Sequence, residues 1–254
     1  MGTPYSLTEK KIVITGASSG IGRQCAILFS QFGAQVIIVG RNKERLSETF
    51  NNLKSGQHIQ IQADITNYDF TEKIIKDIFS KCGKIDGFVH SAGIELSYPL
   101  NNMSPALYEK VFSVNLIAGF EWAKQLSKTK YISPNGASFV FISSIMSQVG
   151  NASIVAYSAS KGALVSGAKS MAIELAPKKI RVNSISPGYL DDTPMTIARF
   201  SNFTDENIKI IEKQHLLGFG KSMDIANACL FLLSDASRWI TGTNLIVDGG
   251  YCAR

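Results

Sequence analysis

The stretch Lys11-Ile-Val-Ile-Thr-Gly-Ala-Ser-Ser-Gly-Ile-Gly22 decides the fold of this 254-residue chain. A short apolar run leads directly into glycines spaced G-x-x-x-G-x-G, and an apolar helical pattern follows them. Glycines let the backbone turn tightly and approach a pyrophosphate, while the following helix offers free N–H groups and the positive end of its dipole. This order predicts a dinucleotide-phosphate site at the start of an α/β domain; the other reading is an ordinary glycine-rich turn.

The rest of the chain continues this alternation of apolar runs and amphipathic segments. We expect strands at 11–15, 35–39, 59–62, 87–90, 138–143, 181–185 and 244–247, and helices near 21–32, 43–53, 68–82, 105–131, 154–176 and 223–234. The strands are almost continuously apolar, which is typical of a parallel sheet buried on both faces. The sequence therefore predicts one α/β domain over residues 1–254, a Rossmann-type doubly wound parallel sheet of about seven strands flanked by helices.

One segment, residues 188–215, departs from this alternation. Asp191-Asp192-Thr193-Pro194 breaks the pattern, and scattered apolar residues follow without a clear strand. Ligands of such sheets bind beyond the carboxyl ends of the strands, so a long excursion there is a candidate substrate lid. A helical insertion packed on the surface is an equal alternative.

Composition narrows the possible functions. The chain is 45% hydrophobic and 18% charged, as expected for a globular protein, and its net charge of +6 suits acidic ligands or an acidic partner. The basic residues are dispersed without a nucleic-acid-binding motif, and no apolar stretch is long enough to span a membrane, so neither kind of partner is expected. The four cysteines form no C-x-x-C pair and the three histidines lack ligand spacing. We expect a cytoplasmic protein without a metal site.

The run Tyr157-Ser-Ala-Ser-Lys161 carries a candidate acid–base pair. Residues four apart share one face of a helix, and an ammonium beside a phenol lowers the phenol's pKa from about 10 by favouring the phenolate. Ser144, thirteen residues before Tyr157, would hold a substrate oxygen against the same phenol. This group suits the interconversion of a carbonyl and an alcohol. Taken alone, the pattern more often reflects a partly buried tyrosine and a lysine on a helix flank.

The end of the second expected strand, Ile37-Ile-Val-Gly-Arg-Asn42, bears on the choice of cofactor. NAD-preferring sites usually carry Asp or Glu here, where it accepts hydrogen bonds from ribose hydroxyls. Gly40 takes that place, and the guanidinium of Arg41 suits a 2′-phosphate, with the Ser18 hydroxyl as a further donor. NADP(H) is therefore favoured over NAD(H), unless Arg41 only begins the next helix on the surface.

Two further strand ends are candidate cofactor contacts. Asp64 would bond an adenine amino group and Ile65 would cover its ring; equally, Asp64 would cap the helix that follows Thr66. Ser91-Ala92-Gly93 would let the chain pass close to a ribose, or it is a simple turn from strand to helix.

Together these motifs resemble the classical short-chain dehydrogenase/reductase family, from about Lys11 to Tyr251. They occur in that family's order: Thr15-Gly16-x-x-x-Gly20-x-Gly22, Asp64, Ala92-Gly93, Asn115, Ser144, Tyr157 with Lys161, Pro187-Gly188 and Ile246-Val247-Asp248-Gly249-Gly250. Within the family, the chain looks most like the 3-oxoacyl-acyl-carrier-protein reductases. Three departures matter. His90-Ser91 replaces the two asparagines of the family's Asn-Asn-Ala-Gly, and one extra residue precedes Thr193, which leaves the role of that threonine open. Leu217-Gly218-Phe219-Gly220 lacks the arginine often found between that Gly and Phe.

The resemblance implies a catalytic tetrad of Asn115, Ser144, Tyr157 and Lys161. Tyr157 would be the general acid in reduction, Ser144 would orient the carbonyl, and Lys161 would lower the tyrosine pKa and hold the nicotinamide ribose. Asn115 would anchor a water of a proton relay. The residues expected to contact the cofactor are Gly16, Ser18, Ser19, Gly20, Ile21, Gly22, Arg41, Asn42, Asp64, Ile65, Ser91, Ala92, Gly93, Tyr157, Lys161, Pro187, Gly188, Leu190 and Thr193.

The implied activity is NADPH-dependent reduction of a ketone to a secondary alcohol by a homotetramer. A 3-oxoacyl thioester is one implied substrate, and Lys128 with Lys130, or Lys178 with Lys179, would dock its acidic carrier unless they are only solvated helix ends. The alternative is a sugar, polyol, steroid or other small carbonyl compound. A non-catalytic NADP-binding regulator is less favoured, because it predicts erosion of the tetrad.

Overall fold

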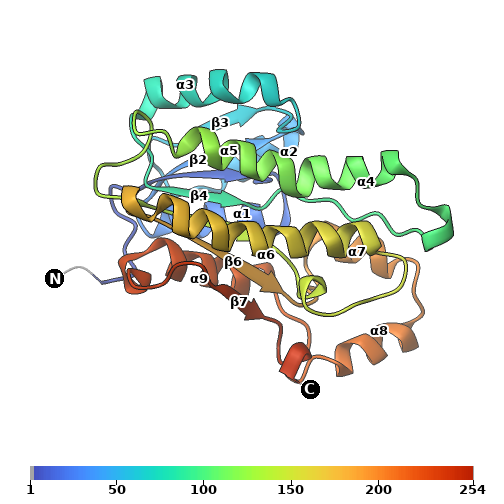
Figure 1. Ribbon diagram of the computed structural model, residues 1–254. Helices are drawn as coiled ribbons and strands as arrows, with labels where there is room; N and C mark the ends of the chain where they lie inside the picture. Colours follow the sequence, from blue (N-terminus) through green and yellow to red (C-terminus); the bar gives the residue numbers. More distant parts are fainter. Residues whose placement is uncertain (1–2, 254) are drawn as a thin grey trace.

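The computed structural model describes residues 3–253 and contains one seven-stranded parallel sheet (Figure 1). The strands follow the order β3-β2-β1-β4-β5-β6-β7 across the sheet. Their bounds are β1 (Lys11–Thr15), β2 (Gln35–Gly40), β3 (Ile59–Gln62), β4 (Gly87–His90), β5 (Ala137–Ile142), β6 (Ile180–Pro187) and β7 (Asn244–Val247). The predicted doubly wound Rossmann-type fold is confirmed, and its topological switch point lies between β1 and β4.

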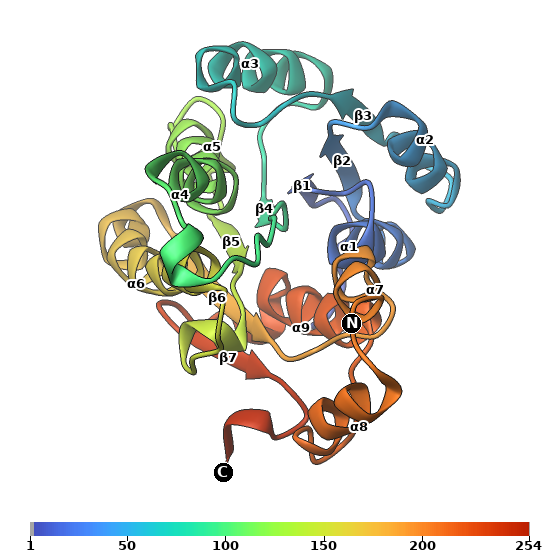
Figure 2. The ribbon, with the colours of Figure 1, turned by 90° about the vertical axis from the view of Figure 1, so that its right-hand side faces the viewer.

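Helices cover both faces of this sheet (Figure 2). On one face lie α1 (Gly20–Gln31), α2 (Lys43–Asn51) and α9 (Ser222–Leu233); on the other lie α3 (Thr71–Cys82), α4 (Pro105–Phe112), α5 (Ala118–Leu126) and α6 (Val155–Leu175). Alternate strand residues supply the two cores: Ile12 and Ile14 pack with α1 and α9, whereas Val13 packs toward α3 and α5. Burial on both faces explains the continuous apolar runs.

The prediction of one continuous helix near 105–131 is wrong, because the helix is interrupted and ends earlier. It begins at Pro105, changes to a π-helical turn over Ser113–Ile117, and ends at Leu126. The apolar residues Tyr131 and Ile132 extended the helical pattern, but they are buried in the connection to β5, where Ile132 pairs with Ile85. Tyr131 packs against Phe79 of α3, and both Tyr131 and Ile132 belong to the core on this face of the sheet.

His90, at the end of β4, joins β1 to this π turn. Its Nδ1 lies 2.9 Å from the Thr15 hydroxyl and its Nε2 lies 3.3 Å from the Asn115 carbonyl. A carbonyl can only accept, so Nε2 donates and Nδ1 of the neutral ring accepts from Thr15. The ring packs directly on α5, where a Cβ at Gly119 would lie 2.6 Å from His90 Cδ2. A glycine at position 119 therefore makes room for the imidazole.

Stability below neutral pH is expected to depend on His90. Burial, and secondly the charge of Lys161, lowers the pKa of His90 to about 3, below its ordinary value of about 6.5. The unfolded chain then binds the extra proton first, so the free energy of unfolding falls as pH drops from about 6.5 toward 3. Between about pH 7 and pH 5 the loss is about 2 kcal/mol. Urea unfolding at both pH values measures it.

The variant His90→Asn is the control for this pH effect, because its amide does not titrate. We expect the variant to lose less stability than the wild type over the same interval. Equal losses in the two proteins would assign the pH effect to other groups.

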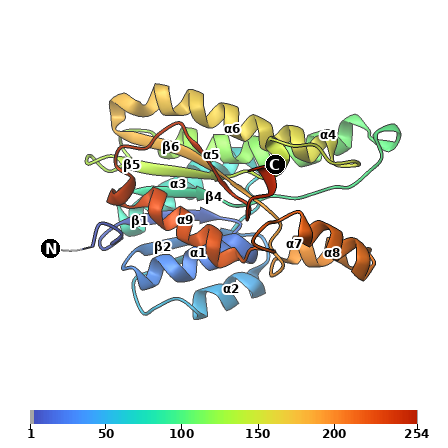
Figure 3. The ribbon, with the colours of Figure 1, turned by 90° about the horizontal axis from the view of Figure 1, so that it is seen from below.

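Residues 188–215 form two short helices at the end of the sheet toward which the strands point (Figure 3). They are α7 (Pro194–Phe200) and α8 (Asp205–Lys213). Thr193 caps α7, and the Asp192 carboxylate accepts hydrogen bonds from the Ser222 backbone and hydroxyl. The segment is thus anchored at its entry to the start of α9. Within residues 3–253, no helix has both the length and the apolar character needed to cross a bilayer.

Candidate active site

Two adjoining cavities lie beyond the carboxyl ends of the strands. One extends along the glycine loop and the ends of β2, β3 and β4, and the other lies over Ser144 and Tyr157. Both cavities share Ile21, Ser91, Gly93, Thr193 and Met195 as lining residues. A long ligand extending through both would therefore pass the shared wall.

The glycine loop packs closely against the chain that follows β4. Gly16 has φ +70°, and a Cβ there would lie 2.5 Å from the Ala92 backbone nitrogen. The loop leads into α1, whose N-cap residue Ser19 makes no side-chain capping bond, so its first N–H groups remain available to a ligand. This N-terminus and the tight loop fit the pyrophosphate of a dinucleotide. Gly22 lines neither cavity and instead packs beneath the Gly16 carbonyl.

The far end of this cavity is basic. Arg41 lines it with a side chain that is 61% exposed, and Asn42 caps α2 by accepting from the Arg45 N–H. Arg45, which sequence reasoning missed, lines the same cavity. A Cβ at Gly40 would lie 3.2 Å from Ser18 Cβ and 3.3 Å from Leu46 Cδ1, so an acidic side chain fits poorly there. This donor set suits a phosphate better than a ribose diol.

The remaining predicted contacts divide between the two cavities. Gly16, Ser18, Ser19, Gly20, Ile21, Arg41, Asn42, Asp64, Ile65, Ser91, Ala92, Gly93 and Thr193 line the first, and Ser144, Tyr157, Lys161, Pro187, Gly188 and Leu190 line the second. Asp64 accepts from the Thr66 N–H and hydroxyl within a local turn. It does not cap the helix that follows, because the N-cap residues there are Asn67 and Phe70. Thr193 lines both cavities while capping α7.

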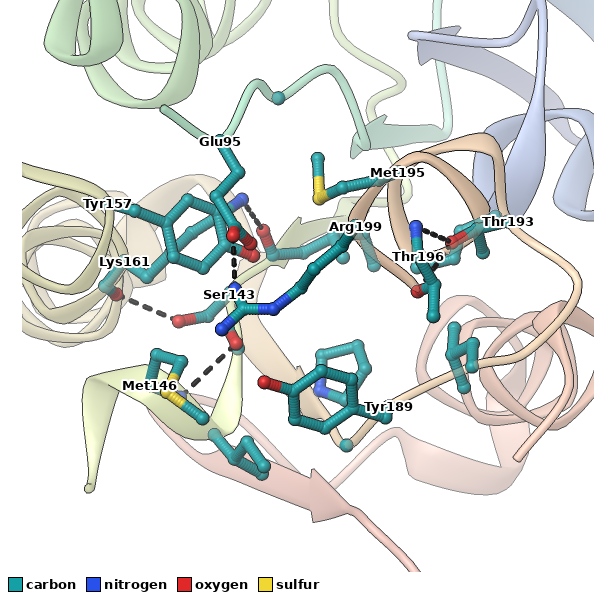
Figure 4. Close-up of a pocket in the computed structure, with 18 of the residues that line it drawn as sticks. Glu95, Ser143, Met146, Tyr157, Lys161, Tyr189, Thr193, Met195, Thr196 and Arg199 are labelled. Carbon is teal, nitrogen blue, oxygen red and sulfur yellow. Dashed lines mark hydrogen bonds and ion pairs between the residues drawn. The ribbon is translucent and has the colours of Figure 1, made fainter. Parts of the chain in front are cut away.

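Ser144, Tyr157 and Lys161 all line the second cavity. Figure 4 shows Tyr157 next to Lys161. Tyr157 lies in the first turn of α6 and Lys161 one turn later, with its Nζ 5.7 Å from the centre of the tyrosine ring. The Lys161 ammonium donates to the Ile142 carbonyl at 2.8 Å. Ser144 faces Tyr157, whereas Ser143 points away and donates to the Lys161 carbonyl at 2.8 Å. The alternation of a strand end thus separates the two serines.

The pKa of Tyr157 is raised, whereas the sequence led us to expect a lowered value. Burial, and secondly the Glu95 carboxylate, raises the pKa of Tyr157, while the hydrogen bond to Ser144 and the charge of Arg199 oppose the rise. Burial also lowers the pKa of Lys161 to about 8. Both shifts follow from withdrawal of the charged forms from water, which the sequence pattern does not report.

Asn115 is fully buried in the π turn and lines neither cavity. Its amide oxygen accepts from the Ile94 N–H at 2.8 Å, and its amide nitrogen donates to the Ile94 carbonyl and to Ser160, each at 3.0 Å. These bonds hold the chain just after Gly93, next to Lys161. The proposed water relay through Asn115 stays a prediction.

Two charged residues that sequence reasoning missed enter the second cavity. Arg199 extends from α7 across the cavity to Glu95, which follows β4, and the two form an ion pair (Figure 4). Their side chains are only 16% and 15% exposed. Isolated charges in a sequence are ordinarily interpreted as solvated, and 104 positions separate this pair. The segment 188–215, already suspected as a lid, hinted at such a contact.

The lysines considered for carrier docking line neither cavity. Lys178 follows the C-terminal end of α6, whereas Tyr157 lies in its first turn, and the helix of 21 residues is about 30 Å long. Lys128 and Lys130 form ion pairs with Glu72. That these lysines dock an acidic carrier stays a prediction.

The chain is similar to known proteins over almost its full length. A family model described as "Enoyl-(Acyl carrier protein) reductase" matches residues 16–252. A Listeria innocua protein named NAD-dependent glycerol dehydrogenase is 34% identical over 247 residues, 97% of this chain and 95% of that protein. A 3-oxoacyl-[acyl-carrier-protein] reductase of Thermotoga maritima is 33% identical over 246 residues, 96% of this chain and 98% of that protein.

A solved structure extends the similarity to the fold. A candidate NAD(P) dependent gluconate 5-dehydrogenase from Beutenbergia cavernae, with NADP bound at low occupancy, superposes with a TM-score of 0.90 at 30% identity. The match covers 99% of this chain and all of the other, so both cavities fall within the shared fold.

Proposed function

This chain belongs to the classical short-chain dehydrogenase/reductase family, and we propose that it interconverts a ketone and a secondary alcohol with NADP(H) as cofactor. The observation that carries the proposal is that Ser144, Tyr157 and Lys161 line one cavity, next to a tight glycine loop that fits a dinucleotide. When bound, the nicotinamide would supply the hydride in reduction and accept it in oxidation.

The chain's own residues would handle the proton and the carbonyl. Tyr157 would donate its phenolic proton to the carbonyl oxygen in reduction and take a proton from the alcohol in oxidation. Its raised pKa keeps the phenol protonated, which favours the role of acid in reduction. Ser144 would donate a second hydrogen bond to the same oxygen and polarise it. Lys161, fixed by the Ile142 carbonyl, would stabilise the phenolate that forms.

The preference for NADP(H) rests on the basic end of the dinucleotide cavity. Arg41 and Arg45 border it, and the crowding around Gly40 disfavours the carboxylate that an NAD site usually carries. The relatives point both ways, since one is named as NAD-dependent and another was solved with NADP. The arginines of this chain support NADP(H).

Two substrate classes follow from the relatives. Similarity to the Thermotoga reductase supports a 3-oxoacyl thioester, and similarity to the Listeria dehydrogenase supports a small polyol or its ketone. We also propose a homotetramer, which the exposed apolar side chains of Ile173 and Trp239 support. Residues 188–215 would act as the substrate lid, since side chains of α7 line the second cavity. The cytoplasmic location stays a prediction.

Oxidation of NADPH by the purified protein tests the proposal. We expect turnover with at least one member of a panel comprising acetoacetyl thioesters, hydroxyketones, ketoses and cyclic ketones, followed as loss of NADPH absorbance. Tight NADPH binding without turnover of any ketone would contradict the enzyme proposal and favour an NADP-binding regulator.

A further inference from the structure

We propose that Glu95 and Arg199 form a subsite that binds a hydroxyl group next to the reacting carbonyl, which makes the substrate a neutral hydroxyketone or the matching polyol. This inference rests on the proposed function and names its substrate class. The subsite joins two segments far apart in sequence, the loop after β4 and helix α7, within the cavity that contains Tyr157 and Ser144 (Figure 4).

The Glu95–Arg199 ion pair lies close to Tyr157. Glu95 and Arg199 line the same cavity as the tyrosine, and both charges reach it: the carboxylate raises the pKa of Tyr157 and the guanidinium lowers it. Glu95 follows Gly93 closely, and Gly93 borders Lys161. The ion pair therefore lies beside the acid–base group, where the part of the substrate next to its carbonyl must lie.

The guanidinium of Arg199 has a hydrogen-bond donor without an acceptor. Its Nη1 donates to Glu95, but its Nε is buried and has no hydrogen-bond partner among the residues that the structure describes. The guanidinium is held by the aromatic rings of Tyr189 and Phe203, whose centres lie 5.6 Å and 5.8 Å from Arg199 Cζ. A buried donor without an acceptor costs stability until a ligand supplies one.

The charge balance of the pair identifies the ligand. Arg199 supplies donors and Glu95 supplies acceptor oxygens, and a hydroxyl group both accepts and donates, so it satisfies both partners at once. The two charges cancel, so an anionic substrate gains nothing without displacing Glu95. An alkyl chain would cover both charges without replacing the water that solvates them, which is unfavourable. A neutral hydroxyl fits best.

A pair of ketones of the same size tests this subsite. Hydroxyacetone carries a hydroxyl group where 2-butanone carries a methyl group, and the two are otherwise identical. Their reduction adds a hydride to the carbonyl carbon and a proton to the carbonyl oxygen, which gives 1,2-propanediol and 2-butanol. We expect kcat/KM with NADPH to be about 100-fold or more higher for hydroxyacetone, because buried polar groups discriminate strongly against a substrate that leaves them unsatisfied. Acetoacetate and an acetoacetyl thioester complete the set.

The double variant Glu95→Leu/Arg199→Met removes both charges and keeps apolar volume. We expect the preference for hydroxyacetone over 2-butanone, measured as the ratio of their kcat/KM values, to fall at least about 10-fold. Arg238→Met is the matched control, because Arg238 is exposed and lines neither cavity, and it should keep the wild-type preference. NADPH binding, followed by fluorescence titration, should be the same in all three proteins.

Two results would overturn the subsite. One is an unchanged preference in the double variant; the other is a wild-type protein that favours 2-butanone, acetoacetate or the thioester over hydroxyacetone.

A binding measurement separates this inference from the proposed function. In the Tyr157→Phe protein loaded with NADPH, ligand-observed NMR should detect hydroxyacetone, and the signal should vanish when Glu95→Leu/Arg199→Met is added. If the wild type reduces no ketone but this binding pattern is found, the proposed reaction fails and the subsite stands. If hydroxyacetone does not bind, or binds regardless of the pair, the subsite is rejected.

Discussion

Replacing Tyr157 with phenylalanine is expected to lower kcat for ketone reduction by about 100- to 10,000-fold, the usual contribution of a general acid. The variant loses only the phenolic oxygen, which faces Ser144 and is the proton donor of the proposed reaction. The ring and its packing are kept. Steady-state kinetics with saturating NADPH measures the effect, and NADPH affinity should change little.

Tyr131→Phe is the matched control for this experiment. Tyr131 is also buried, its hydroxyl has no hydrogen-bond partner within the described chain, and it packs against Phe79, where it lines neither cavity. Its variant should keep the wild-type kcat. A Tyr157→Phe protein with near wild-type kcat would refute the role of the phenol, and a loss of NADPH binding in that protein would point to structural damage instead.

Arg41→Ala is expected to weaken NADPH binding by about 10- to 100-fold and to leave NADH binding within about twofold. The reason is that the guanidinium would pair with the 2′-phosphate, which NADH lacks. Because Arg41 is 61% exposed, the effect should shrink as salt is added. Fluorescence titration with both cofactors, at low and high ionic strength, measures the loss.

Lys43→Ala provides the comparison for Arg41→Ala. Lys43 is an exposed cation only two positions away but does not line the dinucleotide cavity. Its removal should affect both cofactors equally and weakly. If Arg41→Ala weakened NADPH and NADH to the same degree, the proposed contact with the 2′-phosphate would be wrong.

The sheet was predictable from sequence because burial on both faces leaves strands of continuous apolar residues. Every expected strand agrees with the structure to within a residue or two, and β6 extends to Pro187. The meeting of Tyr157 and Ser144 was also predictable, since parallel strands and their following helices deliver loops to one edge of the sheet. The four-residue spacing of Tyr157 and Lys161 on a helix also made it predictable that the two side chains share one face.

Features that depend on distant partners were not predictable. Glu95 and Arg199 carry no local signal of pairing, because charged residues on loops and short helices are usually solvated. The raised pKa of Tyr157 depends on burial, which residue spacing does not encode. The end of α5 was misplaced because Tyr131 and Ile132 are apolar in either a helix or a buried connection.

The π turn at Ser113–Ile117 has a consequence for comparing this chain with others. A π turn accommodates one residue more than an α-helix over the same rise, so α4 and α5 are two helical segments whose side-chain phases differ by that residue. An alignment that treats 105–126 as one uninterrupted helix would rotate either α4 or α5 by a full position.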